Sequence, residues 1–290
     1  MVEQVEAIDA AVPALNLRRE ELADIELQLF LDALLRYGGY DFRNYNQSAL
    51  RRRIADAMRS ENIATISGLQ DRLLHDERAL ATFLVSMSGG TSSLFHDPSF
   101  LQAFATNVVP LLQTYSFIRI WVPGSGTGGD AYSLAAILKE NGLLEKTIIY
   151  ATCVNDVTTA VAKAGFYEHR SEADFVALAR RAGIVEPLSR YFDVRETYAT
   201  PLEELRAGVM FARHNPVEDG SINEFHAIVA RGILPLFNGA VQYRLHKLFF
   251  DSLMHLGFLG LGQHESLANT VHERAFRQVV PDQPIFRRMR

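Results

Sequence analysis

Apolar residues recur at helical spacing through the first hundred positions of the chain. Between 20 and 37 they recur at roughly helical spacing, and Gly38-Gly39 ends that helix. Further helices are predicted at 46–60, 65–75 and 77–87. The pattern therefore predicts an all-helical unit at the start of the chain.

Beyond residue 100 the pattern changes to short apolar runs that alternate with helical stretches. The predicted strands lie at 117–122, 147–152 and 226–230, and the predicted helices that follow lie at 131–140, 157–165 and 240–254. This alternation indicates a parallel sheet covered by helices on both faces. The segment 191–211 interrupts it, and its runs 192–198 and 208–211 are expected to pair as a small antiparallel insert.

These patterns predict three parts. Residues 1–18 are expected to be a flexible lead-in, 19–100 a helical N-terminal domain, and 101–290 an α/β domain with a β insert near 189–212.

Composition excludes several classes of function. With a net charge of -5, the chain lacks the positive electrostatic field that is typical of a nucleic-acid-binding protein. The single cysteine, Cys153, excludes an internal disulfide and a CxxC metal site, and the histidines show no metal-ligand spacing, so no metal is expected. No apolar run is long enough for a bilayer, and the N-terminus lacks a signal pattern, so we expect a cytoplasmic protein without membrane insertion.

The most informative segment, 118–133, has the order of a buried strand, a glycine-rich turn and a helix start. Gly124, Gly126 and Gly128 alternate in the turn, where glycine permits a tight bend and close approach of a ligand. The first amides of the next helix can then face a polar ligand group. Such units bind cofactors in dinucleotide enzymes and S-adenosylmethionine-dependent methyltransferases, although a tight turn without any ligand is the alternative.

Six segments carry a more specific signal in their order and spacing. They lie at 40–54, 94–98, 123–133, 150–152, 211–215 and 262–267, the last reading Gly-Gln-His-Glu-Ser-Leu. Together they resemble the CheR family of chemotaxis receptor methyltransferases. The resemblance implies an α/β fold: a Rossmann-like class I methyltransferase sheet with a helical N-terminal domain and a small β-subdomain insert. It also implies methyl transfer from S-adenosylmethionine to a receptor glutamate by direct displacement, which depends on positioning.

The same resemblance assigns candidate site residues. Cofactor contacts fall on Ser92, Gly124, Gly126, Gly128, Asp130, Cys153, Asn215, Pro216, Arg231 and Gly232. Catalytic roles fall on His96 and Arg231, and Glu265 with Ser266 is expected to set turn geometry.

Several of these positions depart from the family pattern. In the segment 94–98, where the family motif has an arginine, this chain has His96, a shorter side chain that is mostly neutral near pH 7. Its strand-end aspartate, which in Rossmann-like sites accepts hydrogen bonds from ribose hydroxyls, is Cys153, a poor acceptor. Where the family has Arg-Asn, this chain has Arg231-Gly232, so the asparagine side chain is missing. Where the family has Gly-Glu-Glu, this chain has Gly128-Gly-Asp130.

Three hypotheses follow from these departures. The first is a CheR-like protein with weak or lost S-adenosylmethionine-dependent glutamate methylation and a binding or regulatory role in signalling. The second is an active, divergent protein-glutamate O-methyltransferase with a remodelled pocket. The third is a pocket converted to another small ligand, such as a nucleotide.

A basic stretch surrounds the second predicted helix. Its members are Arg43, Arg51, Arg52, Arg53 and Arg59, of which Arg52 and Arg59 share a helix face. The resemblance implies docking to an acidic helical protein partner such as a chemoreceptor, with electrostatic attraction setting the fit. A solvated charged face without a partner is the alternative.

Overall fold

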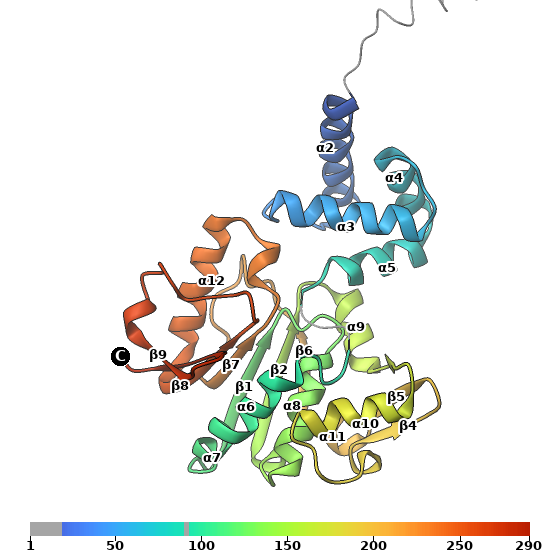
Figure 1. Cartoon of the computed structure of the whole chain (residues 1–290). Helices are drawn as coiled ribbons and strands as arrows, with labels where there is room; N and C mark the ends of the chain where they lie inside the picture. The colour runs from blue at the N-terminus through green and yellow to red at the C-terminus, as the bar shows by residue number, and fades with distance from the viewer. Residues whose placement is uncertain (1–18, 90–92) are drawn as a thin grey trace, which may run out of the picture. The chain divides into compact units, whose positions relative to one another are not determined.

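The computed structural model describes residues 19–89 and 93–290, so the expected lead-in at 1–18 and the candidate Ser92 lie outside the described residues. The chain divides into two compact units (Figure 1). The smaller unit ends at Asn44 and resumes over Leu50–Phe83, and the larger takes Tyr45–Ala49 with Leu84–Arg290.

Helices account for the smaller unit, as the periodicity predicts. They are α2 (Arg19–Gly38), α3 (Gln47–Ser60), α4 (Ile66–His75) and α5 (Glu77–Met87). The first residues of α3 and the last residues of α5 are counted with the larger unit. The core gathers fully buried side chains such as Phe30, Leu34 and Leu69, and the ring of Phe30 packs edge-on against Phe83 with centroids 5.6 Å apart. The helices predicted from 46 to 87 are confirmed.

The larger unit is built on a seven-stranded sheet in the order β6-β2-β1-β7-β8-β10-β9. Its strands are β1 (Ile118–Pro123), β2 (Thr147–Cys153), β6 (Val209–Arg213), β7 (Phe225–Ala230), β8 (Leu253–Leu261), β9 (Phe276–Val280) and β10 (Gln283–Arg288). Neighbouring strands run parallel from β6 through β2, β1 and β7 to β8, whereas β10 is antiparallel to both of its neighbours. The three strands predicted from the sequence are the centre of this sheet, and the expected Rossmann-like α/β class is confirmed.

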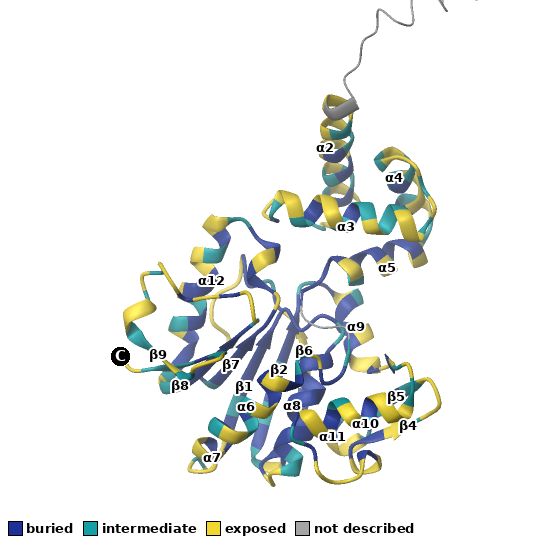
Figure 2. Cartoon of the chain, viewed as in Figure 1, coloured by how far each residue is buried: buried dark blue, intermediate teal, exposed yellow. Residues whose placement is uncertain are grey.

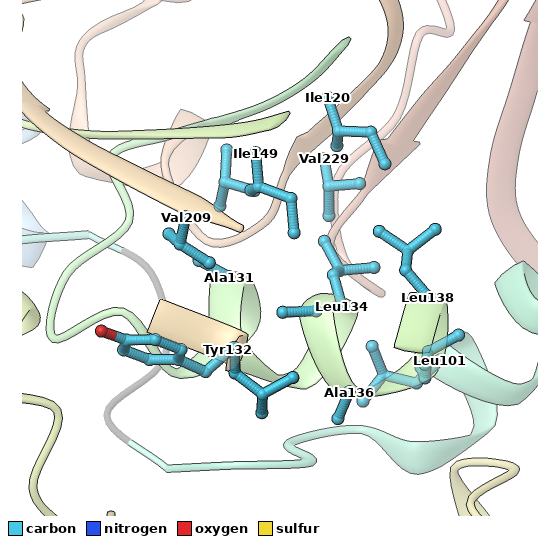
Figure 3. Packing of buried hydrophobic residues seen from close by; sticks show 14 of the residues in the cluster. Leu101, Ile120, Ala131, Tyr132, Leu134, Ala136, Leu138, Ile149, Val209 and Val229 are labelled. Atoms are coloured by element: carbon cyan, nitrogen blue, oxygen red, sulfur yellow. The ribbon is translucent and has the colours of Figure 1, made fainter. Parts of the chain in front are cut away.

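Helices cover both faces of the sheet. They are α6 (Pro98–Asn107), α7 (Val109–Leu112), α8 (Gly129–Glu140), α9 (Asp156–Ala164), α10 (Glu172–Arg181), α11 (Glu203–Ala207) and α12 (Gly239–Ser252), with short 3-10 turns η2 (Leu144–Lys146), η3 (Leu188–Arg190), η4 (Leu234–Leu236) and η5 (Glu273–Ala275). Ile120 points toward Leu134 of α8 (Figure 3), whereas the neighbouring Trp121 packs against Phe249 of α12. Adjacent strand residues point to opposite faces, so each face has its own apolar layer.

The central strands β1, β2 and β7 are mostly buried (Figure 2), and so is the first part of α8. Every residue of α8 from Gly129 to Leu138 is buried, because the helix lies between the sheet and further elements. A helix that is covered all round in this way fixes the position of its own N-terminus, which is where the glycine turn ends.

A second, three-stranded antiparallel sheet has the order β3-β5-β4. It contains β3 (Tyr167–Glu168), β4 (Phe192–Val194) and β5 (Tyr198–Pro201). The expected small antiparallel sheet is present and includes residues of the run 192–198, but the expectation that this run pairs with 208–211 is wrong. Those residues begin β6, which pairs in parallel with β2 from Ile149 opposite Val209 to Cys153 opposite Arg213. The alternating burial of β6 gave no local sign of which sheet it joins.

Candidate cofactor site

The glycine turn connects β1 to α8 in the predicted strand–turn–helix order. Gly124, Gly126 and Gly128 have φ values of 60°, 56° and 88°, the left-handed region that favours glycine. A Cβ atom on Gly124 would lie 2.6 Å from Ile233 Cδ1, and one on Gly128 would lie 2.9 Å from the ring of Phe211. The turn therefore requires glycine for both its conformation and its packing.

Neighbouring strands hold this turn in place. The Ser125 amide donates a hydrogen bond to the carbonyl of Thr152 on β2 at 2.9 Å. The hydroxyl of Tyr167 on β3 donates to the Thr127 carbonyl at 2.7 Å. The turn is thus held by hydrogen bonds to both β2 and β3.

Cys153 ends β2 beside the turn, and only 1% of it is exposed. Its Sγ donates to the Gly126 carbonyl at 3.6 Å. Burial raises the pKa of the thiol to about 11, so the side chain stays neutral. At the position from which a Rossmann-like site anchors ribose hydroxyls, the protein presents a neutral donor that is already engaged with its own backbone.

Asp130 and Arg231 form a buried ion pair behind the turn. Arg231 Nη1 lies 3.2 Å from Asp130 Oδ1, and Arg231 Nη2 lies 3.4 Å from Asp97 Oδ2. The guanidinium also donates to the His96 carbonyl and lies over the Phe100 ring, 4.5 Å from its centroid. We call these five residues the Arg231 cluster. It ties the end of β7 to the starts of α6 and α8, so Arg231 and Asp130 act on the turn as supports.

His96 lies in a segment whose backbone is strained. Phe95 and Asp97 on either side of it both have φ near 52°, which is unusual for residues other than glycine. The Phe95 amide donates to Ser133 Oγ at 2.8 Å, and Asp97 caps α6 by accepting from the Phe100 amide. The His96 side chain is exposed, so the segment presents it at the surface. The role of Ser133 was missed from the sequence, because the contact joins positions 38 residues apart.

Asn215 and Pro216 follow β6 at the same edge of the sheet. Asn215 Oδ1 accepts from the Val217 amide at 3.1 Å, and the Asn215 amide donates to Asp219 Oδ2 at 2.8 Å. The asparagine side chain therefore shapes its own loop, and Pro216 is buried beside it.

Glu265 organises the loop that follows β7. The residue is 8% exposed, and its carboxylate accepts from the backbone amides of Gly232 at 3.1 Å, Leu234 at 2.9 Å and Gly262. Burial raises the pKa of this carboxyl group above its ordinary value of 4.5, against the lowering effect of the three amides. The turn-setting role expected of Glu265 is confirmed. Gly232, with φ of 71°, contributes only backbone.

In the smaller unit, acids neutralise part of the predicted basic stretch. Arg43 pairs with Asp41 at 2.7 Å, and Arg51 and Arg59 pair with Asp24 and Asp56 respectively. Arg52 is exposed, and no ion pair to it is found among the described residues. The free positive charge available for a partner is therefore smaller than the count of arginines indicates.

Within 19–89 and 93–290, no group of three or more histidine, cysteine, aspartate or glutamate side chains is placed to hold a metal ion. No helix in the same ranges combines the length and hydropathy that crossing a membrane requires.

Comparison with known proteins identifies the family. Residues 90–281 match the CheR methyltransferase, SAM binding domain, and residues 25–88 match the CheR methyltransferase, all-alpha domain. The "Putative methyltransferase Cher3" of Pseudomonas putida is 37% identical over 93% of this chain and 98% of its own length. A chemotaxis protein methyltransferase of Listeria innocua is 24% identical over 80% of this chain and 86% of its own.

Solved structures are more distant. A SAM-dependent methyltransferase from Geobacter sulfurreducens, in complex with S-adenosyl-L-homocysteine, has 15% identity and a TM-score of 0.35, covering 70% of this chain and 58% of its own. The family assignment rests on the two domain matches and on the relative of near-equal length. By both, the chain belongs to the CheR methyltransferase family.

Proposed function

We propose that this CheR-family protein binds S-adenosylmethionine weakly, transfers methyl groups to glutamate slowly or not at all, and acts in signalling by binding an acidic protein partner. One observation carries the proposal: the strand-end position that should anchor the ribose holds Cys153, a buried neutral thiol bonded to Gly126. We place this role in the cytoplasm, as the family resemblance implies.

The free energy of the missing hydrogen bonds supports weak cofactor binding. A hydrogen bond to a charged acceptor is worth about 1.5–3 kcal/mol, and one to a neutral acceptor about 0.5–1.5 kcal/mol. With Cys153 in place of aspartate, the cofactor loses a hydrogen bond to a charged acceptor. With Gly232 in place of asparagine, it loses a hydrogen bond to a neutral side chain. Together they weaken cofactor affinity by about two orders of magnitude, since each 1.4 kcal/mol is about tenfold. Asp130 offers no replacement, because it is paired with Arg231.

An active methyltransferase is the second candidate. The retained glycine turn favours it, because left-handed glycines between a strand and a helix are typical of nucleotide-type cofactor sites. The names of the relatives as methyltransferases favour it as well. In an active enzyme, loop residues would supply the hydrogen bond to the ribose that Cys153 does not accept.

Calorimetric titration with S-adenosylmethionine and S-adenosylhomocysteine separates the two candidates. We expect dissociation constants about a hundredfold weaker than micromolar, for the reason given above. Micromolar binding, together with transfer of a radiolabelled methyl group to a receptor fragment, would establish the active enzyme instead. A nucleotide panel in a thermal-shift assay tests the remaining alternative, a pocket converted to another small ligand.

A further inference from the structure

The peptide between Thr127 and Gly128 lies where the glycine turn enters α8. Its carbonyl and its N–H belong to one planar unit, so they turn together. The Gly128 amide donates to the Ser125 carbonyl at 2.9 Å, and the Tyr167 hydroxyl donates to the Thr127 carbonyl at 2.7 Å. Both sides of this peptide are therefore held, one by the turn itself and one by a side chain of β3.

Gly128 alone does not fix the orientation of this peptide. Its φ is 88°, but glycine adopts positive and negative φ about equally well, so the glycine does not oppose a flip of the peptide before it. Gly128 is also the N-cap of α8, and it has no side chain to accept a capping hydrogen bond. The way in which the chain enters α8 therefore depends on bonds from outside the helix.

Tyr167 is suited to hold the peptide permanently. Only 2% of the residue is exposed, and a Cβ atom on Gly128 would lie 3.0 Å from its hydroxyl oxygen. Its ring meets that of Tyr132 edge-on, with centroids 6.1 Å apart, and its backbone pairs with Ala199 of β5. Burial raises the pKa of the hydroxyl well above its ordinary value of 10, so the group remains a hydrogen-bond donor.

We propose that Tyr167 is a positioning residue for the cofactor, which selects one orientation of the Thr127–Gly128 peptide. The first amides of a helix lack acceptors within the helix, and they are the donors that a helix after a glycine turn offers to a ligand. Because Tyr167 fixes the peptide that precedes them, it fixes the direction in which the first amides of α8 point. The inference rests on the proposed function, since it concerns how the turn binds S-adenosylmethionine. It adds a residue of the second sheet to a site otherwise built on the seven-stranded sheet.

Hydrogen exchange of the Gly128 amide, followed by nuclear magnetic resonance on protein with isotope-labelled glycine, tests the peptide orientation without any ligand. Tyr167→Phe keeps the ring and removes the hydroxyl. We expect Gly128 to exchange about two- to tenfold faster in this variant, the range that loss of one neutral hydrogen bond gives. Gly142 is the internal reference, because its amide closes a turn on the Lys139 carbonyl at the other end of α8. Unchanged exchange at Gly128 in the folded variant overturns the proposal.

Calorimetric titration with S-adenosylhomocysteine tests the consequence for the ligand. Tyr191→Phe is the matched control, because Tyr191 is also a buried tyrosine of this unit and its hydroxyl donates to Glu140 instead of the turn. We expect Tyr167→Phe to weaken binding by about two- to tenfold and Tyr191→Phe to leave it unchanged, with thermal melts to verify that both are folded.

Equal losses of affinity in the two tyrosine variants would show that removing any buried hydroxyl has this effect, and they overturn the positioning role. Wild-type affinity in Tyr167→Phe overturns it as well. Micromolar binding by the wild type would refute the weak cofactor binding proposed above, whereas the ratio of affinities between variants and the exchange of Gly128 would still decide the role of Tyr167. The two failures are therefore distinguishable.

Discussion

Replacing Cys153 with aspartate should strengthen S-adenosylmethionine binding. The substitution restores a carboxylate at the end of β2, beside the turn glycines, where it can accept hydrogen bonds from ribose hydroxyls. A hydrogen bond to a charged acceptor is worth about 1.5–3 kcal/mol, which corresponds to a gain of about ten- to 150-fold in affinity.

The same substitution should destabilise the protein without ligand. The thiol is 1% exposed and donates to the Gly126 carbonyl, so a carboxylate there loses solvent and faces an oxygen that cannot donate to it. We expect a loss of about 1–3 kcal/mol in the free energy of unfolding, which added ligand should partly restore.

Calorimetry at equal protein concentration measures the gain, with Cys153→Ser as the control that is small and neutral. Thermal melts with and without ligand show that each variant is folded. If Cys153→Asp is folded and binds no more tightly than Cys153→Ser, the missing strand-end acceptor is not what limits binding, and the argument for a weakened cofactor site fails.

Three further substitutions test the supports of the site. Arg231→Met should lower the free energy of unfolding in urea by about 3–5 kcal/mol, because it leaves Asp130 buried without a counter-charge; a loss below 1 kcal/mol, on the order of an exposed pair, would contradict that. Gly124→Ala should shift the melting temperature far more than Gly142→Ala, since both positions have positive φ but only Gly124 has atoms within reach of a new Cβ; equal shifts would mean that packing against Ile233 is unimportant. Glu265 has a raised pKa in the folded state, so the folded protein holds this proton more tightly than the unfolded chain. Its stabilising contribution is complete below pH 4.5 and declines as the pH rises toward the folded pKa. The stability of the wild type relative to Glu265→Gln should therefore fall over that window in parallel urea titrations, and a constant difference would show that Glu265 titrates as an ordinary exposed carboxyl.

Much of the architecture followed from local patterns. The central strands and the helices of the first unit are set by apolar spacing, and the glycine turn by residue type, so both were predictable from short windows. The strands after residue 252 were not predicted, because β8 contains Gly257 and Gly260 and lacks a clear alternation. The run at 208–211 was misassigned because burial alternates in the same way in either sheet.

The site was less predictable than the fold. The resemblance assigned Arg231 to the cofactor and to catalysis, yet its charge is engaged with Asp97 and Asp130, which lie 134 and 101 residues away in the chain. Such a pairing depends on where β7 ends relative to α6 and α8, and no local window contains that information.

The Arg231 cluster has a consequence for how this protein can change over generations. Its five members support the glycine turn from behind, and Cys153 and Gly232 contribute no side chain to it. Substitutions at those two positions therefore leave the contacts of the cluster intact, whereas loss of Asp130 or Arg231 breaks a buried ion pair and would be removed by selection for a folded chain. A lineage could thus exchange one ligand for another, or for none, by mutations that leave the support of the turn in place, and later regain a cofactor by the same short route.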